Sequence, residues 1–131
     1  MTAKTAALII GVIFIAVGLA GFVDNPIVGT SENVIFQADQ MHNIVHIVSG
    51  VLFVFVALAA SGSAAGFLKL FGIVYLIIGI VGLVTVGTSP SDMGKVLGFL
   101  NVNGADNYLH VGLGIVIFLA GFAKNRVPAT A

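Results

Sequence analysis

The stretch AGFLKLFGIVYLIIGIVGLVTV, residues 65–86, decides the fold class of this chain. It is apolar throughout except for Lys69 near its start, and a helix needs about 20 mainly apolar residues to cross the hydrocarbon core of a bilayer. Three further stretches have the same character: residues 6–23, 41–60 and 105–123. The sequence therefore predicts an all-α, four-helix transmembrane bundle that forms a single domain over residues 1–131.

The composition of the whole chain agrees with this interpretation. Of the 131 residues, 59% are hydrophobic and 8% are charged, whereas soluble domains average about 25% charged residues. So few charges exclude a soluble globular enzyme, and so high a hydrophobicity excludes a disordered chain. The formal net charge of zero provides no basic field for nucleic acid, so no nucleic-acid partner is expected. The absence of cysteine excludes disulfides and thiolate metal sites.

The connections between the expected helices differ in length. Residues 61–63 read Ser-Gly-Ser and predict a tight turn. The other two connections, residues 24–40 and 87–104, are longer and each contains a proline, which does not continue a helix. Each also contains a short apolar patch, which we expect to lie in the membrane interface or to fold over the bundle.

The distribution of basic residues predicts the orientation in the membrane, because short cytoplasmic loops are enriched in lysine and arginine. Lys95 is the only basic residue on one side. The others all fall on the opposite side: Lys4, Lys69, Lys124 and Arg126. Both termini are therefore expected to be cytoplasmic. The acidic residues all belong to the outer side: Asp24, Glu32, Asp39, Asp92 and Asp106.

The sequence also contains an internal duplication. Three glycines of the first span recur with the same spacing in the third span: Gly11, Gly18 and Gly21 against Gly72, Gly79 and Gly82. The second and fourth spans share an Asn-x-x-His-x-x-x-Gly pattern. We therefore expect two parallel two-helix repeats, about 6–60 and about 65–123, related by a pseudo-two-fold axis along the membrane normal. Glycines seven residues apart give each helix a stripe of small residues, which membrane helices use for close packing.

Polar residues gather where the second and fourth spans begin. Asp39 and Asn103 stand where helix N-caps are expected. Asn43 and Asn107 follow one turn into each span, at corresponding positions of the two repeats. Asparagine at these positions can form hydrogen bonds between helices, which specify their register. These four residues are therefore predicted to form a structural polar cluster at the outer end of the bundle.

Three histidines and one carboxylate lie in the same region. His42 and His46 are four residues apart and share a helix face. The duplication makes His46 and His110 symmetry mates at equal depth, and it pairs His42 with Asp106 across the axis. Ionisable residues inside a membrane span are costly and indicate a functional site by default.

Three interpretations of this cluster remain open. The preferred one is an interhelical polar clasp, for which no cofactor is expected. The second is a cofactor site, in which His46 and His110 ligate haem, or His42, His46, His110 and Asp106 bind a transition metal, since imidazole suits Zn, Cu, Fe and Ni. The third is movement of protons or small solutes, which is weakened because no charged residue lies deep in the inner half of any span except Lys69 at the cytoplasmic end.

The segments HNIVHI (residues 42–47) and NGADNYLH (residues 103–110) resemble the paired Asn-x-x-His signatures of a bacterial family of small four-span integral membrane proteins, a domain of unknown function. The resemblance covers nearly the whole chain and implies the fold and a location in a bacterial cell membrane or internal membrane. The family often has an Asn-Pro step before the first histidine pair, where this chain has Gln40 and Met41. The resemblance assigns no catalytic residues.

The leading functional prediction is a small non-enzymatic accessory or structural subunit, which packs within a larger membrane complex or forms a homo-oligomer. Its expected partners are the lipid bilayer and other membrane proteins or further copies of itself. The alternative is a membrane protein that binds haem, a metal or a pigment through the outer histidines and acts in electron transfer or sensing. A small-solute or proton transporter is the third possibility.

Overall fold

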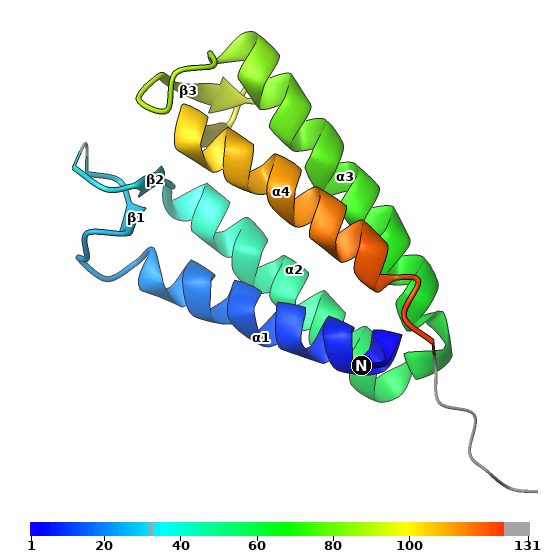
Figure 1. Cartoon of the computed structure of the whole chain (residues 1–131). Coiled ribbons are helices and arrows are strands. Elements are labelled where there is room, and N and C mark those ends of the chain that lie inside the picture. The colour runs from blue at the N-terminus through cyan, green and yellow to red at the C-terminus, as the bar shows by residue number, and fades with distance from the viewer. Residues whose placement is uncertain (32, 125–131) are drawn as a thin grey trace, which may run out of the picture.

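The protein is represented by a computed structural model that describes residues 1–31 and 33–124. Four helices lie along one another, and short strands cover one end of the bundle (Figure 1). In chain order the elements are α1 (Ala3–Ala20), β1 (Val28–Gly29), β2 (Phe36–Gln37), α2 (Gln40–Ala59), the 3₁₀ turn η1 (Ser61–Ser63), α3 (Ala64–Thr85), β3 (Met93–Val96), β4 (Leu100–Asn103) and α4 (Gly104–Ala120). The described chain is mostly helical, with four α-helices, as the sequence predicts.

Three helical segments are long and apolar enough to cross a membrane: α1, α2 and the segment Ser61–Thr85, which joins η1 to α3. The fourth helix, α4, is apolar but shorter than the predicted span 105–123. Its 17 residues extend about 26 Å at about 1.5 Å per residue, slightly less than the hydrocarbon thickness of about 30 Å. The helix ends because Gly121 acts as its C-cap and the chain then turns.

Both long connections contain strands, which the all-α prediction did not include. β1 pairs with β2 in parallel, and β3 pairs with β4 in an antiparallel hairpin. Gly98, in the turn of this hairpin, has a φ of +79°, a conformation that glycine adopts without steric cost. The apolar patch of the second connection, residues 96–100, lies in this hairpin. Val96 and Leu100 are buried, whereas Leu97 and Phe99 are exposed. This patch therefore contributes one face to the interior and one face to the surroundings of the bundle.

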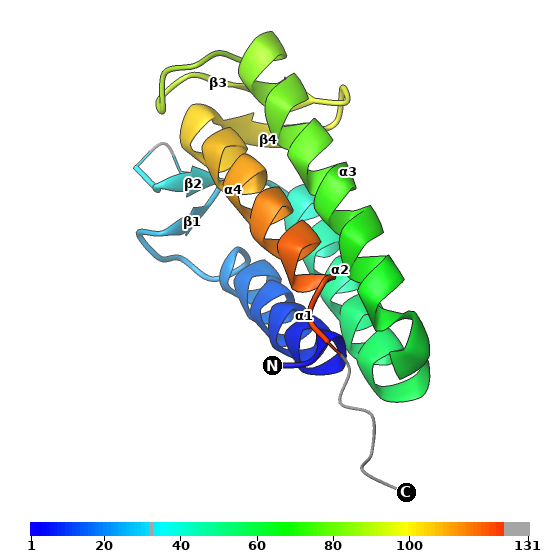
Figure 2. The same cartoon turned by 45° about the vertical axis from the view of Figure 1, so that its right-hand side comes forward.

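The bundle consists of two helical hairpins, because α1 packs along α2 and α3 packs along α4 (Figures 1 and 2). Glycines make both contacts close. A Cβ atom on Gly11 would lie 2.8 Å from the carbonyl oxygen of Gly50. A Cβ atom on Gly114 would lie 2.8 Å from the carbonyl oxygen of Gly72. These four glycines occupy corresponding positions of the duplicated sequence, so the same close approach recurs in both hairpins.

An aromatic core joins the two hairpins. The side chain of Phe53 on α2 is fully buried, and its ring contacts those of Phe14, Phe67 and Phe71 edge-on, with centroids 5.6, 4.9 and 5.0 Å away. Phe14 lies on α1, whereas Phe67 and Phe71 lie on α3. The core therefore connects helices of both halves of the chain.

The lysines are distributed as the orientation argument requires. Lys4 lies in the first turn of α1, Lys69 lies in the second turn of α3, and Lys124 follows α4, all at the end of the bundle opposite the strands (Figures 1 and 2). The ammonium of Lys69 lies 4.1 Å from the centroid of the Phe122 ring. Lys95 belongs to β3, at the other end. The remaining basic residue of that argument, Arg126, and the acidic residue Glu32 lie outside the described residues.

Candidate functional site

The surface of the bundle is apolar, unlike that of a soluble protein. Large apolar side chains are exposed along all four helices, for example Val12, Phe55, Ile77 and Val116. The buried polar side chains gather at or near the strand-covered end: Gln37, His42, Asn43, His46, Ser49, Asn103, Asp106, Asn107 and His110. A membrane solvates the apolar surface, so the functional question concerns this buried polar cluster.

Side-chain caps explain why α2 and α4 begin where they do. Asp39 Oδ1 accepts a hydrogen bond from the backbone N–H of His42 at 2.8 Å, and Asn103 Oδ1 accepts one from Asp106 at 2.9 Å. Both caps have extended backbone angles, as N-cap residues do. The two predicted N-caps are confirmed. Asn103 has a second role, because its Nδ2 donates to the carbonyl of Ile35 at 2.9 Å and so joins the two long connections.

Replacing Asn103 by alanine is expected to cost more stability than the same change at Asp39. An N-cap contributes about 1 kcal/mol, and a further hydrogen bond contributes about 1 kcal/mol. Asn103→Ala should therefore lower the free energy of unfolding by about 2 kcal/mol, against about 1 kcal/mol for Asp39→Ala, since only Asn103 bonds to Ile35. Reversible unfolding in mixed detergent micelles measures both. Equal losses would contradict the bond between the connections.

The three histidines meet in the interior. His42 and His46 are one turn apart on α2, and His110 comes from α4. The ring centroids are 4.6 Å apart for His42 and His46, 5.5 Å for His42 and His110, and 6.2 Å for His46 and His110. One ring nitrogen from each histidine lies within 4.8 Å of the other two. All three side chains are at least nine-tenths buried.

A backbone carbonyl assigns the proton on one of these rings. His42 Nδ1 lies 2.8 Å from the carbonyl oxygen of Asn101 in β4. A carbonyl only accepts hydrogen bonds, so Nδ1 carries the proton and Nε2 keeps a free lone pair. This is the arrangement in which metal-ligating histidines are usually held, with the second nitrogen donating to a carbonyl or a carboxylate.

Asp106 lies between histidines of both hairpins. Its Oδ2 is 3.6 Å from His42 Nδ1, and its Oδ1 is 3.7 Å from His110 Nε2, both beyond hydrogen-bond distance. Asp106 Oδ2, His46 Nδ1 and His110 Nδ1 are buried without a hydrogen-bond partner. Buried polar atoms are nearly always paired, and leaving one unpaired costs about 1–3 kcal/mol. The cluster therefore has an unused capacity to bind a cation or a polar ligand.

The two asparagines of the predicted polar cluster have a different environment. The Asn43 side chain lies against the backbone of Gly21 on α1, and the Asn107 side chain lies against that of Gly82 on α3. No side chain fits at either glycine, because its Cβ would coincide with the asparagine amide. The structure thus brings Asn43 and Asn107 to the seams within the hairpins, while His42, His46, His110 and Asp106 meet between the hairpins.

Sequence reasoning missed three residues of the site. No pattern in the sequence indicates Asn101, because its contribution is a backbone carbonyl that any residue could supply. Phe14 and Tyr75 flank the histidines, with the Phe14 ring 5.8 Å from His46 and the Tyr75 ring 5.6 Å from His110. They occupy corresponding positions of the two repeats, so aligning the repeats by their glycines would have identified this aromatic pair.

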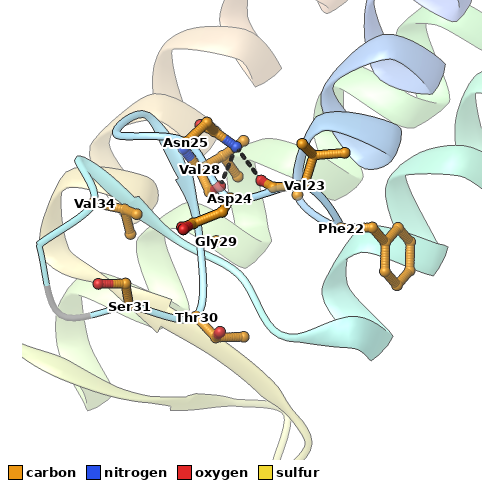
Figure 3. Close-up of a pocket in the computed structure, with 10 residues that line it drawn as sticks. Phe22, Val23, Asp24, Asn25, Val28, Gly29, Thr30, Ser31 and Val34 are labelled. Carbon is orange, nitrogen blue, oxygen red and sulfur yellow. Dashed lines mark hydrogen bonds between the residues drawn. The ribbon is translucent and has the colours of Figure 1, made fainter.

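A second polar region lies in the first connection, in a pocket of about 250 Å³ lined by residues 21–25, 28–31 and 34 (Figure 3). The Asn25 side chain organises this loop. Its Nδ2 donates to the carbonyls of Val23 and Val28 at 2.7 and 3.0 Å, and its Oδ1 accepts from the backbone N–H groups of Ile27 and Val28. These bonds make Asn25 a structural residue of the connection, so the histidine cluster is the better candidate site.

The comparison with protein families shows which family the chain belongs to. A family model described as a domain of unknown function, DUF4383, matches residues 4–123. The chain belongs to the DUF4383 family. The DUF4383 match extends over all four helices and includes every residue of the histidine cluster. No curated protein and no solved structure matches the chain.

Proposed function

We propose that this chain is a small, non-enzymatic integral membrane protein that binds one transition-metal ion at the outer end of its helical bundle. The observation that carries the proposal is the approach of three buried histidine nitrogens, from two different hairpins, to within 4.8 Å of one another. His42, His46 and His110 would supply three ligands, and Asp106 would supply a fourth or hold the imidazoles in position. This set has the composition of a zinc or copper site.

The distances favour an ion over a clasp of hydrogen bonds. Ligands of a tetrahedral ion with bonds of about 2.0–2.1 Å are about 3.4 Å from one another. The separation of Asp106 Oδ1 from His110 Nε2, 3.7 Å, is close to this value, whereas a hydrogen bond would be near 2.9 Å. A bound cation would take one nitrogen from each histidine and one oxygen from Asp106, so it would satisfy part of this unpaired polar set and leave the remaining ring nitrogens and carboxylate oxygen for a further ligand.

A bare ion is preferred to haem. Haem ligated by His46 and His110 would place its macrocycle between the two rings. The His42 ring occupies that region, since its centroid is 4.6 Å from that of His46 and 5.5 Å from that of His110. A single ion needs no such space and uses His42 as a ligand.

The proposed membrane arrangement has four spans and two parallel repeats. Corresponding glycines make the same close contacts in both hairpins, and the corresponding rings of Phe14 and Tyr75 lie at similar distances from His46 and His110, 5.8 and 5.6 Å, which supports the repeats. Lys4, Lys69 and Lys124 at the end away from the strands support cytoplasmic termini. The histidine site would then face the outer side of a bacterial cell membrane or internal membrane.

The accessory-subunit prediction is compatible with this proposal. A protein whose helices expose apolar side chains all round can contact lipid, other membrane proteins or further copies of itself. Transport is the weaker candidate, because the charged residues described within the helices of the inner half of the bundle lie only in the first two turns of α1 and α3. A sensing or electron-transfer role would need the bound metal ion, whereas a purely structural role would not.

Purified protein is expected to bind one equivalent of Zn²⁺, Cu²⁺ or Co²⁺, and the double variant His46→Ala/His110→Ala is expected to lose it. Removing an outer-shell partner alone costs about 10–100-fold in metal affinity, so loss of two ligands should cost at least about 100-fold. Elemental analysis gives the stoichiometry, and the visible spectrum of the Co²⁺ form reports tetrahedral coordination.

Asp39→Asn serves as the matched control, because it keeps the oxygen that caps α2 and removes no proposed ligand. It should retain the ion. Helix content and elution volume verify that the double variant is folded. A wild-type protein that takes up none of the three ions, or a folded double variant that still binds, would overturn the proposal in favour of an interhelical clasp.

A further inference from the structure

The histidine cluster is approached by two cavities, one on each side of the bundle. The larger one has a volume of about 370 Å³ and lies between α1, the first connection and α4, with His46 and Asp106 in its lining. The smaller one has about 100 Å³ and lies between α2 and α3, with His42, His46 and His110 in its lining. Ligand sites typically have volumes of about 300–1,000 Å³, so only the larger cavity has the size of one.

The duplicated sequence makes these cavities counterparts of each other. Five residues of each lining correspond: Val17 with Ile78, Phe36 with Leu100, His46 with His110, Asp106 with His42 and Leu109 with Val45. Both cavities therefore arise from one interface that the fold uses twice, once between α1 and α4 and once between α3 and α2.

The difference in volume comes from the residues at the interface. Ala16 and Ala20 line the larger cavity, and the corresponding positions on α3 are Ile77 and Val81. Ala16 and Ala20 are also exposed on the outer face of α1, so the cavity is bordered on that side by the lipid-facing surface. The interface beside α1 thus has two small residues where its counterpart beside α3 has branched ones, and it holds the larger cavity.

The wall of the open cavity is almost entirely apolar. Most of its lining is aliphatic or aromatic, and the ionisable residues in the lining are His46 and Asp106. Asp106 is 98% buried, and its Oδ2 has no hydrogen-bond partner, nor has His46 Nδ1. A molecule with an apolar body and one polar head would pair these atoms while leaving the wall dry.

We propose that this cavity binds a neutral, lipid-soluble molecule of the quinone or quinol class, which enters from the bilayer beside α1 with its oxygen toward His46 and Asp106. The Phe36 ring in the lining favours a flat ring. A quinol hydroxyl can donate to Asp106 Oδ2, and a quinone carbonyl can accept from His46 Nδ1 when that nitrogen carries the proton. The choice of a neutral head rests on the proposed function, because a bound metal ion already balances the Asp106 carboxylate and would repel a cationic head.

The test is a binding titration of the full-length protein in detergent with a decyl-substituted benzoquinone, its quinol and, as the cationic comparison, dodecylamine. Saturable binding of the quinone or the quinol at about one equivalent is expected. Ala16→Phe fills the open cavity and should weaken binding at least tenfold. Ile77→Phe places the same side chain at the corresponding position of α3, away from the open cavity. This variant is the matched control and should bind as the wild type does.

Ala20→Phe is a second cavity-filling variant, used if Ala16→Phe fails to fold by helix content and elution volume. No saturable binding, binding that neither filled variant weakens, or tighter binding of dodecylamine would overturn the proposal. Metal content measured on the same samples separates the two proposals. Protein that holds no metal but binds the quinone contradicts only the metal site, and metal-loaded protein that binds no quinone contradicts only the cavity.

Discussion

The Gly114→Ala variant is expected to lose at least about 2 kcal/mol of unfolding free energy, although alanine favours a helix over glycine by about 1 kcal/mol. The added Cβ would lie 2.5 Å from the backbone nitrogen of Leu76 and 2.8 Å from the carbonyl oxygen of Gly72. Both are backbone atoms of α3, so no side-chain rotation relieves the overlap and the two helices must separate. Separation weakens the whole seam, because membrane helices are held by close packing.

Gly112 provides the control on the same helix. A Cβ atom at Gly112 meets nothing within 4 Å, so Gly112→Ala should be neutral or should stabilise α4 by about 0.5–1 kcal/mol. Gly50→Ala should reproduce the loss in the first hairpin, where the Cβ would lie 2.6 Å from the carbonyl oxygen of Gly11. Unfolding in mixed micelles measures all three. If Gly112→Ala and Gly114→Ala behave alike, the packing of α4 on α3 is different from that described.

Truncation of Phe53 is the second large effect, with an expected loss of about 3–5 kcal/mol in Phe53→Ala. Its ring is fully buried and touches three aromatic rings from α1 and α3. In a bilayer the loss comes from forfeited dispersion contacts and from the cavity left behind, since lipid tails are as apolar as the protein interior. The variant should therefore loosen the contact between the two hairpins.

Phe55 is the matched control, two residues further along α2 and 60% exposed on the outer face. Phe55→Ala exchanges a ring–lipid contact for another lipid contact, so its unfolding free energy should change little. The comparison uses the same chemistry on the same helix and differs only in burial. A loss as large for Phe55→Ala as for Phe53→Ala would indicate that the outer face of α2 is covered by another protein copy or partner.

The helical architecture was accessible from the sequence because long apolar runs are the strongest local signal in a protein chain. The predicted spans agree with α1, α2 and α3 to within a few residues, and the polar N-caps Asp39 and Asn103 were identified by residue type and position. The strands were missed because runs of two to four residues have no measurable periodicity. The end of α4 was missed because Phe122 and Ala123 remain apolar after the helix has stopped.

The candidate site was predictable as a set of residues but not as a geometry. Helical spacing puts His42 and His46 on one face, and the duplication suggests that His110 lies nearby. The orientation of the His42 ring depends on the Asn101 carbonyl, which comes from a strand that the sequence did not predict. The unequal cavities depend on Ala16 and Ala20. Their small size indicates a cavity only when they are compared with Ile77 and Val81, the corresponding residues of the other repeat.

The bonds between the two connections impose an order on the assembly of the protein in the membrane. The seam of each hairpin joins helices that are adjacent in the chain, so each hairpin can form as soon as its own two helices are inserted. The contacts of Ile35 with Asn103 and of His42 with Asn101 join residues from different hairpins. They form only after the second connection has reached the first. Completion of the histidine cluster also needs α4, so a chain interrupted before α4 lacks His110 and Asp106 and presents no finished site.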